Sequence, residues 1–338
     1  MKTALVKSPN KILFKNEQQP PSPGPQEALI RVRYCGVCGS DIAVAYHTAE
    51  DWTHIGHEAV GEVVAVGESV IHLKEGDSVA VECSTTCGLC DHCLRGRSVN
   101  CSNITNIYGK FSGFSEYICV PAKNVIPFQD LDFEQAVLIE PLSVALCMVD
   151  LADISINDDV LIIGPGPLGL MALATVKHMG ARSVSIVGRS GSRARMALAK
   201  ELGANRVISL NGSSTAEAVL TTCQGLGFDK ILITAHPSTI SDAVKLANPG
   251  AIISYIGYAH GKGNIVQFDA DLFHAKHLTL KAYDGPTRCF PEAIDLLSKG
   301  VINHKQFVTH WFDLANLQQA ITTAAEDKEN AIKVIVKI

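Results

Sequence analysis

The stretch that decides the fold is residues 158–189, DDVLIIGPGPLGLMALATVKHMGARSVSIVGR. A short apolar run rich in β-branched residues precedes a run of Leu, Met and Ala, which predicts a strand, a turn, a helix and a second strand. Gly164, Gly166 and Gly169 stand between the first strand and the helix in GxGxxG spacing. This order is typical of a dinucleotide-binding βαβ unit, whose glycines permit a tight turn, close approach of a pyrophosphate and close packing of helix on strand.

The pyrophosphate is expected at the N-terminus of the predicted helix, where the backbone N–H groups carry a partial positive charge. Pro167 and Leu168 begin that helix and, with the three glycines, are predicted to contact the cofactor. A glycine-rich turn of another kind of α/β protein is the alternative. The placement of the glycines between a strand and a helix favours nucleotide binding.

The end of the second strand bears on which nicotinamide cofactor binds. An NAD-binding unit usually places a carboxylate there to hold the ribose 2′-hydroxyl. This chain instead has Arg189, Ser190 and Arg193, and guanidinium groups bind phosphate through paired charged hydrogen bonds. We therefore predict NADP(H) rather than NAD(H), with both arginines on the 2′-phosphate and the serine assisting. The alternative for either arginine, and more so for Arg193, is a solvated surface charge.

Length and composition set the general class. The chain has 338 residues, which favours two domains, and its 47% hydrophobic and 19% charged residues are typical of a globular protein with a large core. A formal net charge of −5 argues against nucleic acids and anionic membranes as partners. The sequence shows no cationic leader with an apolar segment and no apolar run of 18 residues, so we expect a cytoplasmic location.

The order of the predicted elements indicates two domains. Short strands precede the glycine turn and predict a β-rich domain, at residues 4–6, 27–34, 60–66, 78–83 and 116–120. A helix over 133–150 leads into alternating strands and helices, the pattern of a parallel sheet, with strands at 160–163, 184–187, 231–234 and 252–256. A helix at 291–299 and a strand at 332–336 end the chain. We expect this tail to return to the first domain, leaving a cleft between the two.

Four cysteines, Cys87, Cys90, Cys93 and Cys101, lie close together in CGLCDHCLRGRSVNC. Thiolates at this spacing can converge on one tetrahedral ion. Because four cysteines leave no open coordination position, the motif predicts a structural zinc, with free thiols or an iron–sulfur cluster as alternatives. A disulfide framework is not expected in a chain with so large a core. Cys83 stands outside the motif and is predicted to be an ordinary buried thiol.

A second set of candidate metal ligands is dispersed along the chain: Cys38 in CGVCGSD, His57 and Glu58 in GHE, and Glu140 in IEPL. One thiolate, one imidazole and one or two carboxylates suit zinc while leaving a position for water or substrate. Each residue is weak evidence alone, since a single His or Glu is usually structural. Cys35 and Cys38 also form a CxxC pair, but no thioredoxin-like pattern surrounds it and a redox role is disfavoured.

These motifs occur in the order and spacing of the zinc-dependent medium-chain dehydrogenases, which the chain resembles over nearly its whole length. The matching segments are CGSD at 38–41, GHE at 56–58, the four-cysteine lobe, GFSEY at 113–117, EPL at 140–142 and GPGPLG at 164–169. Ser112 replaces the first glycine of the usual GGFxEY motif and is expected to affect the local backbone. Within the superfamily the chain is most similar to the polyol branch around sorbitol dehydrogenase, ketose reductases and threonine dehydrogenase.

The resemblance implies an α/β protein of two domains. A β-rich GroES-like catalytic domain would comprise residues 1–147 and 286–338 and carry a structural zinc lobe at 83–103. A Rossmann domain with a doubly wound parallel sheet would comprise residues 148–285. The resemblance also implies a homo-oligomer, either a tetramer or a dimer, paired through the edge of the cofactor sheet.

A catalytic zinc held by Cys38, His57 and one or both of Glu58 and Glu140 is also implied by the resemblance. Such an ion lowers the pKa of a substrate hydroxyl or, in the reverse direction, polarises the carbonyl. The nicotinamide then exchanges hydride with the adjacent carbon. Sequence alone does not decide which of the two glutamates binds the metal directly.

Proton transfer would involve the residues that follow the cysteine ligand. Ser40 is placed to pass the hydroxyl proton, and Asp41 is expected to orient His57. Many relatives carry a relay histidine five residues after the cysteine ligand, where this chain has Ala43. His47 is close in sequence but displaced, and we predict that it is a surface residue. Either water completes the relay or the substrate differs.

The sequence therefore predicts a zinc-dependent oxidoreductase that transfers hydride between NADP(H) and a polyol, sugar, sugar acid or ketose. One alternative is an NAD-dependent dehydrogenase of a small alcohol or an amino alcohol such as threonine, which requires Arg189 to point away from the cofactor. Another is a non-catalytic relative that kept the fold. Such relatives typically lose the metal ligands, and all of them are present here.

Overall fold

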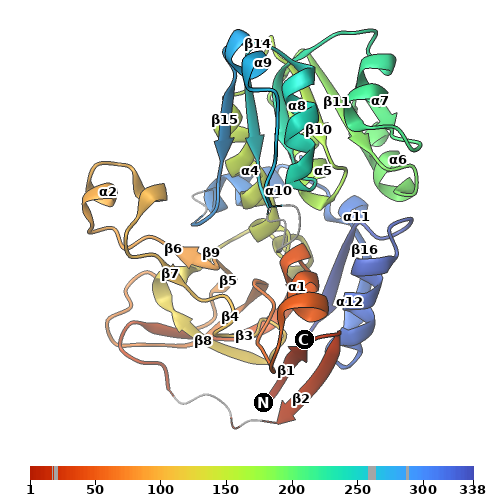
Figure 1. The fold of residues 1–338 in the computed structure, drawn as a ribbon. Coiled ribbons are helices and arrows are strands. Elements are labelled where there is room, and N and C mark those ends of the chain that lie inside the picture. Colours follow the sequence, from red (N-terminus) through yellow and green to blue (C-terminus); the bar gives the residue numbers. More distant parts are fainter. Residues whose placement is uncertain (17, 19–21, 258–263, 287–288) are drawn as a thin grey trace. The chain divides into compact units, whose positions relative to one another are not determined.

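The computed structural model describes residues 1–16, 18, 22–257, 264–286 and 289–338, and Figure 1 shows its helices and strands. The chain forms two compact units. The first unit comprises Met1–Ser143, Gly285–Asp327 and Lys333–Ile338, and the second comprises Val144–Asp284 and Lys328–Ile332. Among the described residues, no helix is both long enough and apolar enough to cross a membrane.

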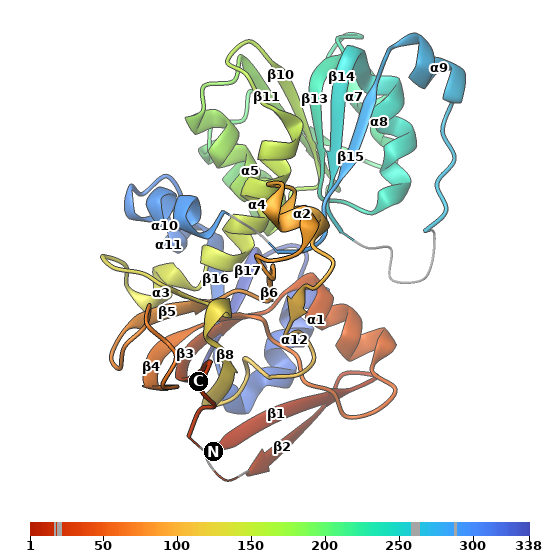
Figure 2. The ribbon, with the colours of Figure 1, turned by 90° about the vertical axis from the view of Figure 1, so that its left-hand side faces the viewer.

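The second unit is built on a six-stranded parallel sheet, seen most clearly in Figure 2. Its strand order is β12-β11-β10-β13-β14-β15, with bounds β10 Asp159–Ile163, β11 Ser183–Gly188, β12 Arg206–Ser209, β13 Phe228–Ile233, β14 Ala247–Tyr255 and β15 Thr279–Ala282. The strand order reverses between β10 and β13, as in a doubly wound sheet that binds ligands beyond the carboxyl ends of these strands. The predicted Rossmann fold is confirmed, although the strands β12 and β15 were not predicted.

Helices connect the parallel strands, because a parallel pair needs a crossover connection. They are α5 (Pro167–His178), α6 (Arg193–Glu201), α7 (Thr215–Thr222), α8 (Ile240–Leu246) and α9 (Ala270–Ala275). On one face of the sheet, Ile163 and Ile233 pack in a single buried cluster with Val219 of α7 and Val244 of α8. This apolar layer holds the carboxyl ends of β10 and β13 in place.

A short piece of the C-terminal tail, Lys328–Ile332, belongs to the second unit. The Ala194 N–H, at the start of α6, donates to the Glu329 carbonyl over 2.9 Å, and the Arg195 Nε donates to the Ala331 carbonyl over 2.8 Å. The tail was predicted to return wholly to the first domain. The difference arises because these hydrogen bonds join residues far apart in the sequence, which no local pattern reveals.

The glycine turn leads directly from β10 into α5. Gly164 has a φ of +111°, which side chains other than glycine rarely adopt. A Cβ on Gly169 would overlap the Gly164 carbonyl oxygen, so this glycine lets the helix pack closely on the turn. A Cβ on Gly166 would meet nothing within 4 Å, and this residue is the N-cap of α5. Each glycine therefore has a different mechanical role, with open space at the second.

The first unit is organised around a seven-stranded mixed sheet. Six strands follow the order β16-β17-β3-β4-β5-β9, and β8 pairs with β3. The bounds are β3 Glu27–Gly36, β4 Glu58–Val66, β5 Ser78–Val81, β8 Tyr117–Pro121, β9 Val125–Pro127, β16 Val308–Asp313 and β17 Lys333–Lys337. The remaining strands form two pairs, β1 (Lys2–Lys7) with β2 (Lys11–Asn16) and β6 (Ser84–Thr85) with β7 (Thr105–Asn106). The predicted β-rich domain is confirmed, with β3 at its centre.

The helix predicted over residues 133–150 is in fact two helices, α3 (Phe133–Ala136) and α4 (Ile139–Ala152). Pro141 explains the break, because a proline ring inside a helix clashes with the carbonyl four residues earlier but is tolerated in the first turn. Glu140 consequently lies in the first turn of α4. The other helices of this unit are α1 Gly39–Ala43, α2 Asp91–Leu94, α10 Phe290–Ser298, α11 His304–Phe307, α12 Leu317–Glu326 and a π-helix at Val44–Thr48.

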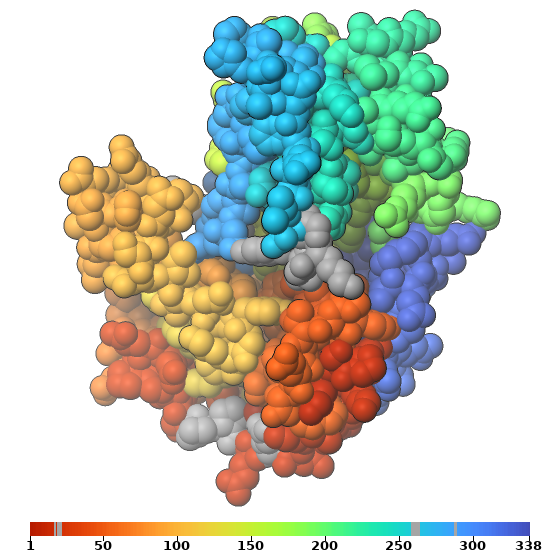
Figure 3. Space-filling model, in the orientation of Figure 1, coloured from red at the N-terminus to blue at the C-terminus, as the bar shows by residue number. Residues whose placement is uncertain are grey.

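The cysteine-rich segment 83–103 forms a lobe on the first unit, visible at the left of Figure 3 in orange and yellow. The lobe buries little apolar surface: Leu89 and Leu94 are 80% and 74% exposed. A segment with so small a core needs another source of stability, such as a structural metal.

Candidate metal and cofactor sites

Three of the predicted zinc ligands meet at neighbouring strand ends in the first unit. Cys38 follows β3 directly, while His57 precedes β4 and Glu58 begins it. Because β3 and β4 are antiparallel, with Gly36 opposite Glu58, these residues are brought side by side. One ligand atom from each of the three lies within 4.8 Å of the others. Sulfur, nitrogen and oxygen at this spacing fit a zinc ion with a fourth position open.

Asp41 fixes the orientation of the predicted histidine ligand. Its carboxylate accepts hydrogen bonds from the backbone N–H groups of Cys38 and Gly56, both over 3.0 Å, and lies 3.5 Å from His57 Nδ1. Burial by itself would raise the pKa of Asp41, but His57 and the two N–H groups hold it below its usual value. With Nδ1 facing this carboxylate, Nε2 is the nitrogen left for a metal.

Only one of the two candidate glutamate ligands belongs to the converging group. Glu58 belongs to the group of ligand atoms, whereas Glu140 does not. Burial raises the pKa of Glu140 to about 7, and the neighbouring Glu58 adds to the rise while His57 opposes it. The structure therefore places Glu58 at ligand distance and Glu140 as a partly buried neighbour outside that group.

Lys333 is a further charged group at this site that the sequence analysis missed. It lies in β17, is 3% exposed, and forms an ion pair with Glu58. Its Nζ also donates to the Val37 carbonyl over 3.1 Å. The available signal was a lysine inside the apolar run AIKVIV, because a charged residue at a buried strand position needs a partner.

The CxxC cysteines do not form a disulfide: Cys35 and Cys38 are both free. Cys35 is fully buried, and its Sγ fills the space beside two glycines, 3.1 Å from the position of a Cβ on Gly56 and 2.8 Å from one on Gly113. Burial raises the pKa of Cys35 well above its usual value. A packed, protonated thiol gives no support to the redox alternative.

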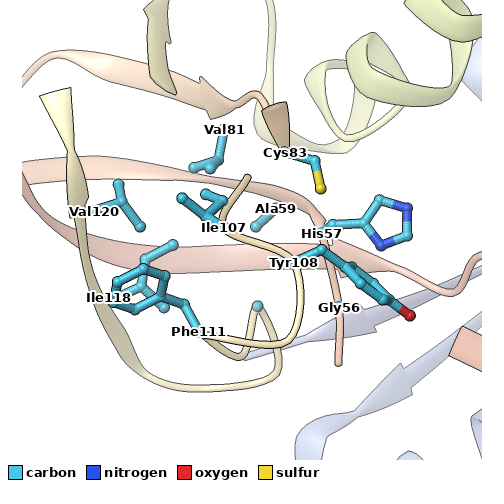
Figure 4. Close-up of a pocket in the computed structure, with 11 residues that line it drawn as sticks. Gly56, His57, Ala59, Val81, Cys83, Ile107, Tyr108, Phe111, Ile118 and Val120 are labelled. Carbon is cyan, nitrogen blue, oxygen red and sulfur yellow. The ribbon is translucent and has the colours of Figure 1, made fainter. Parts of the chain in front are cut away.

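A narrow, mostly apolar cavity lies behind His57 (Figure 4). It is lined by Gly56, His57, Ala59, Val81, Cys83, Ile107, Tyr108, Phe111, Gly113, Ile118 and Val120. Cys83 was predicted to be buried, but it is only partly so and lies at the His57 end of the cavity. The reason is that β5 ends at Val81, so the thiol falls in the loop beyond the sheet. Burial raises its pKa to about 11.

Tyr108 stands at the same end of the cavity and was not predicted. Its ring packs edge-on against His57, with centroids 5.1 Å apart and planes at 78°. Burial raises the pKa of the Tyr108 phenol, and the neighbouring Ser40 hydroxyl opposes that rise. The predicted proton-relay serine is thus placed beside a tyrosine. Ala43 is buried in α1, and His47 is exposed as predicted.

Ser112 shows what the altered GGFxEY motif does. Its hydroxyl is buried and lies 3.1 Å from two backbone carbonyl oxygens, those of Ala4 and Ile55. The side chain therefore ties β1 to the segment that carries His57. This agrees with the expectation that the replacement affects local backbone.

The four lobe cysteines converge. The Sγ atoms of Cys90 and Cys93 are 3.5 Å apart, those of Cys90 and Cys101 are 3.9 Å apart, and those of Cys101 and Cys87 are 3.5 Å apart. Four sulfurs around zinc at about 2.3 Å each are separated by about 3.8 Å. No pair is a disulfide. The spacing fits a tetrahedral Cys₄ zinc site.

Backbone N–H groups point at these sulfurs. Those of Leu89 and Cys90 donate to Cys87 Sγ, over 3.4 and 3.3 Å. They lower the pKa of Cys87, and similar backbone hydrogen bonds lower the pKa of Cys90 to about 6. These backbone hydrogen bonds favour the thiolate, the form of cysteine that binds metal, at Cys87 and Cys90. Burial and the neighbouring thiols instead raise the pKa of Cys93 to about 11.

The second unit holds the residues predicted to bind the nicotinamide cofactor. Arg189 and Ser190 follow β11 and are exposed, and no carboxylate of a described residue pairs with Arg189. Arg193 is different, because its Nη1 lies 2.8 Å from the Glu329 carboxylate. Of the two predicted phosphate ligands, Arg189 is therefore available and Arg193 is already engaged in an ion pair.

Comparison with known proteins gives the family. The Alcohol dehydrogenase GroES-like domain matches residues 24–130, and the Zinc-binding dehydrogenase family matches residues 167–299. The L-arabinitol 4-dehydrogenase of Aureobasidium melanogenum is 34% identical over 327 residues, covering 93% of this chain and 88% of that protein. The chain belongs to the zinc-type medium-chain alcohol dehydrogenases.

Two solved structures of this family are similar throughout. One is the alcohol dehydrogenase RspB of Escherichia coli CFT073 with NADH, with a TM-score of 0.90, 30% identity, and coverage of 100% of this chain and 99% of that one. Another is a protein of Sinorhizobium meliloti 1021 bound to NADP, with a TM-score of 0.87, 26% identity and the same coverage. The predicted fold and enzyme class are confirmed: this dehydrogenase uses zinc and a nicotinamide cofactor to oxidise or reduce a small-molecule substrate.

Proposed function

We propose that this dehydrogenase interconverts a secondary alcohol and a ketone on a polyol, sugar, sugar acid or ketose, with NADP(H) as the hydride carrier. The single observation that carries the proposal is the group formed by Cys38, His57 and Glu58, whose ligand atoms converge within 4.8 Å. The substrate class is supported by polyol and sugar-acid dehydrogenases among the relatives.

The proposed catalytic zinc is held by Cys38, His57 and Glu58. Bound there, zinc would supply a Lewis acid that polarises the substrate oxygen, and the nicotinamide would supply or accept the hydride. Asp41 keeps His57 turned so that one ring nitrogen faces the metal position. The partly buried Glu140 is assigned to the surroundings of the ion, where its raised pKa makes it a second carboxyl able to hold a proton.

Proton movement is assigned to Ser40, which lies on α1 two residues after the cysteine ligand. Its hydroxyl can accept the proton of a substrate alcohol and donate its own onward. Ala43 offers no group for the next step, so water is proposed to carry the proton to solvent.

The structural zinc is assigned to Cys87, Cys90, Cys93 and Cys101. Their sulfur spacing and the backbone N–H groups aimed at them support this assignment. The ion would replace the hydrophobic core that the lobe lacks.

The NADP(H) preference is supported by Arg189. It follows the end of β11, is exposed and has no carboxylate partner among the described residues, so its guanidinium is available for a 2′-phosphate. Gly164, Gly166, Pro167, Leu168 and Gly169 are assigned to the pyrophosphate, and Ser190 to the 2′-phosphate. Arg193 is a weaker candidate because Glu329 already binds it.

NAD(H) is the competing cofactor, and the ion pair of Arg193 with Glu329 favours it. This pair neutralises one of the two positive charges predicted to attract a phosphate. The solved relatives do not decide the question, since one holds NADH and another NADP.

A cytoplasmic homotetramer is proposed as the working form. The outer edge of β15 pairs with no strand in the described part of the chain, and an unpaired sheet edge is a template for a second copy. None of the eleven cysteines is in a disulfide, which is typical of proteins from a reducing compartment.

The test is a comparison of NADPH and NADH oxidation across a panel of ketoses, sugar acids and simple ketones. The proposal expects zinc-dependent activity, a higher kcat/KM with NADPH, and loss of that preference in the Arg189→Asp variant. Activity on the simple ketones alone, or an NADH preference that Arg189→Asp does not change, would favour the alternative.

A further inference from the structure

Tyr108 has a hydroxyl group that no described residue satisfies. The oxygen is buried and forms no hydrogen bond of good geometry with any described residue. A buried polar group without a partner costs about 1–3 kcal/mol and calls for an explanation. Tyr108 takes no part in the mechanism assigned above.

The position of Tyr108 is fixed by its own loop. Its backbone N–H donates to the Asn106 side-chain oxygen over 2.9 Å. The preceding Ile107 is buried and its N–H donates to the Cys83 carbonyl over 3.0 Å. Gly109 follows with a φ of +76°, which turns the chain back. The phenol is therefore held on a short, anchored turn.

The Tyr108 hydroxyl lies beside two of the residues to which the proposed function assigns the reacting oxygen's chemistry. The Tyr108 ring packs against His57, and its hydroxyl neighbours Ser40. In the proposed function His57 helps to hold the zinc that polarises the reacting oxygen, and Ser40 accepts the proton of that oxygen. A group beside both of them would meet an oxygen on the next carbon of the substrate.

We propose that Tyr108 is a specificity-determining residue, whose hydroxyl hydrogen-bonds a second substrate oxygen adjacent to the reacting carbon. The proposal assigns to Tyr108 the recognition of the neighbouring hydroxyl that vicinal diols and the matching α-hydroxyketones carry. The inference rests on the proposed function for the site at Cys38 and His57. A site built to bond a substrate hydroxyl discriminates against analogues that lack it, because its own polar group is then left unpaired.

The experiment compares two ketones that differ by one hydroxyl, acetoin and 2-butanone, as substrates of the zinc-loaded enzyme. The wild type is expected to prefer acetoin by at least about tenfold in kcat/KM. Tyr108→Phe should lower the value for acetoin about tenfold and leave that for 2-butanone within about twofold. An equal loss for both ketones would assign Tyr108 to a step common to all substrates, and no loss for either would remove it from the site. Both results overturn the proposal.

A matched control is Tyr46→Phe, because Tyr46 carries a hydroxyl that is bonded, to Asn10 and Glu326 at 3.2 Å each. The Tyr46→Phe variant should leave kcat/KM unchanged for both acetoin and 2-butanone. In the absence of substrate, Tyr108→Phe should leave the melting temperature unchanged, since its hydroxyl has no partner to lose. A fall of several degrees would show a structural hydrogen bond and contradict the premise.

Failure of the proposed function would be recognised separately. If the wild type reduces neither ketone with either nicotinamide, calorimetric binding of 2,3-butanediol and 2-butanol to the zinc-loaded protein replaces turnover. Tighter binding of the diol, lost in Tyr108→Phe, supports the role of Tyr108 even then. Equal binding of the two alcohols overturns it.

Discussion

Lys333 and Glu58 form a buried ion pair at the centre of the first unit, with the two side chains contributed by β17 and β4. Lys333 is 3% exposed and Glu58 is 2% exposed. Burial alone would lower the pKa of Lys333, but Glu58 holds it above its usual value. The pair therefore favours the charged form of Lys333 at a buried position where an unpaired ammonium would be costly.

Removing the cation should be costly. Lys333→Met leaves the Glu58 carboxylate buried without its counter-charge, and breaking such a pair typically costs about 3–5 kcal/mol. Urea unfolding followed by tryptophan fluorescence measures this, since Trp52 and Trp311 both lie in the first unit. The double variant Lys333→Met/Glu58→Gln removes both charges and should recover part of the loss. A single variant within about 1 kcal/mol of the wild type would show that the pair is unimportant for stability.

The glycine turn allows cofactor binding to be separated from folding. Gly166→Ala places a methyl group where nothing of the chain lies within 4 Å, so stability should change by only about 0.5 kcal/mol. NADPH should nevertheless bind about tenfold more weakly, because the pyrophosphate needs that space. Fluorescence titration with NADPH measures the effect.

Two other glycines serve as controls for that prediction. Gly191→Ala also adds a methyl group in open space and should leave NADPH affinity unchanged. Gly169→Ala forces a Cβ into the Gly164 carbonyl oxygen and should lower stability by about 1–3 kcal/mol. Wild-type NADPH affinity in Gly166→Ala would refute the assignment of this turn to the pyrophosphate.

The two arginines after β11 should differ in their effect on cofactor choice. Arg189→Gln is expected to lower kcat/KM for NADPH about 10- to 100-fold and leave NADH unaffected, since charged hydrogen bonds contribute about 1.5–3 kcal/mol. Arg193→Gln should change either value less than about threefold, because Glu329 already engages its guanidinium. Parallel losses with both nicotinamides, or a larger effect from Arg193, would contradict the assignment of the 2′-phosphate to Arg189.

The cysteine lobe should depend on its metal. Cys90→Ser removes one of four converging thiols, so zinc content should fall from about two ions per chain to about one. Limited proteolysis should then cut within 88–100, since exposed Leu89 and Leu94 provide no core. Cys119→Ser, outside both groups, should keep two zincs and resist cleavage. If Cys90→Ser behaves like Cys119→Ser, the lobe is not a zinc site.

Features encoded by neighbouring residues could be predicted from the sequence. The GxGxxG turn and its flanking strand and helix depend on contacts within a few residues, and they occur as expected. The four-cysteine group is equally local, and it converges. Pro141 is also a local signal for a helix start near residue 139, because proline is tolerated only in the first turn of a helix.

Partners brought together from distant parts of the chain could not be predicted. Lys333 meets Glu58 only because β17 joins the sheet beside β3. Glu329 reaches Arg193 only because the tail returns to the second unit. Tyr108 likewise meets His57 through the folding of a loop with no recognisable motif. Each is a tertiary contact between side chains that have no periodic or spacing signal in common.

The most direct test of the central claim is anomalous diffraction at the zinc absorption edge from crystals of the wild-type enzyme. The account predicts two peaks per chain, one among the four lobe cysteines and one bounded by Cys38, His57 and Glu58. A peak at the lobe alone, or a second peak with Cys38 and His57 turned away from it, would contradict the proposed catalytic site.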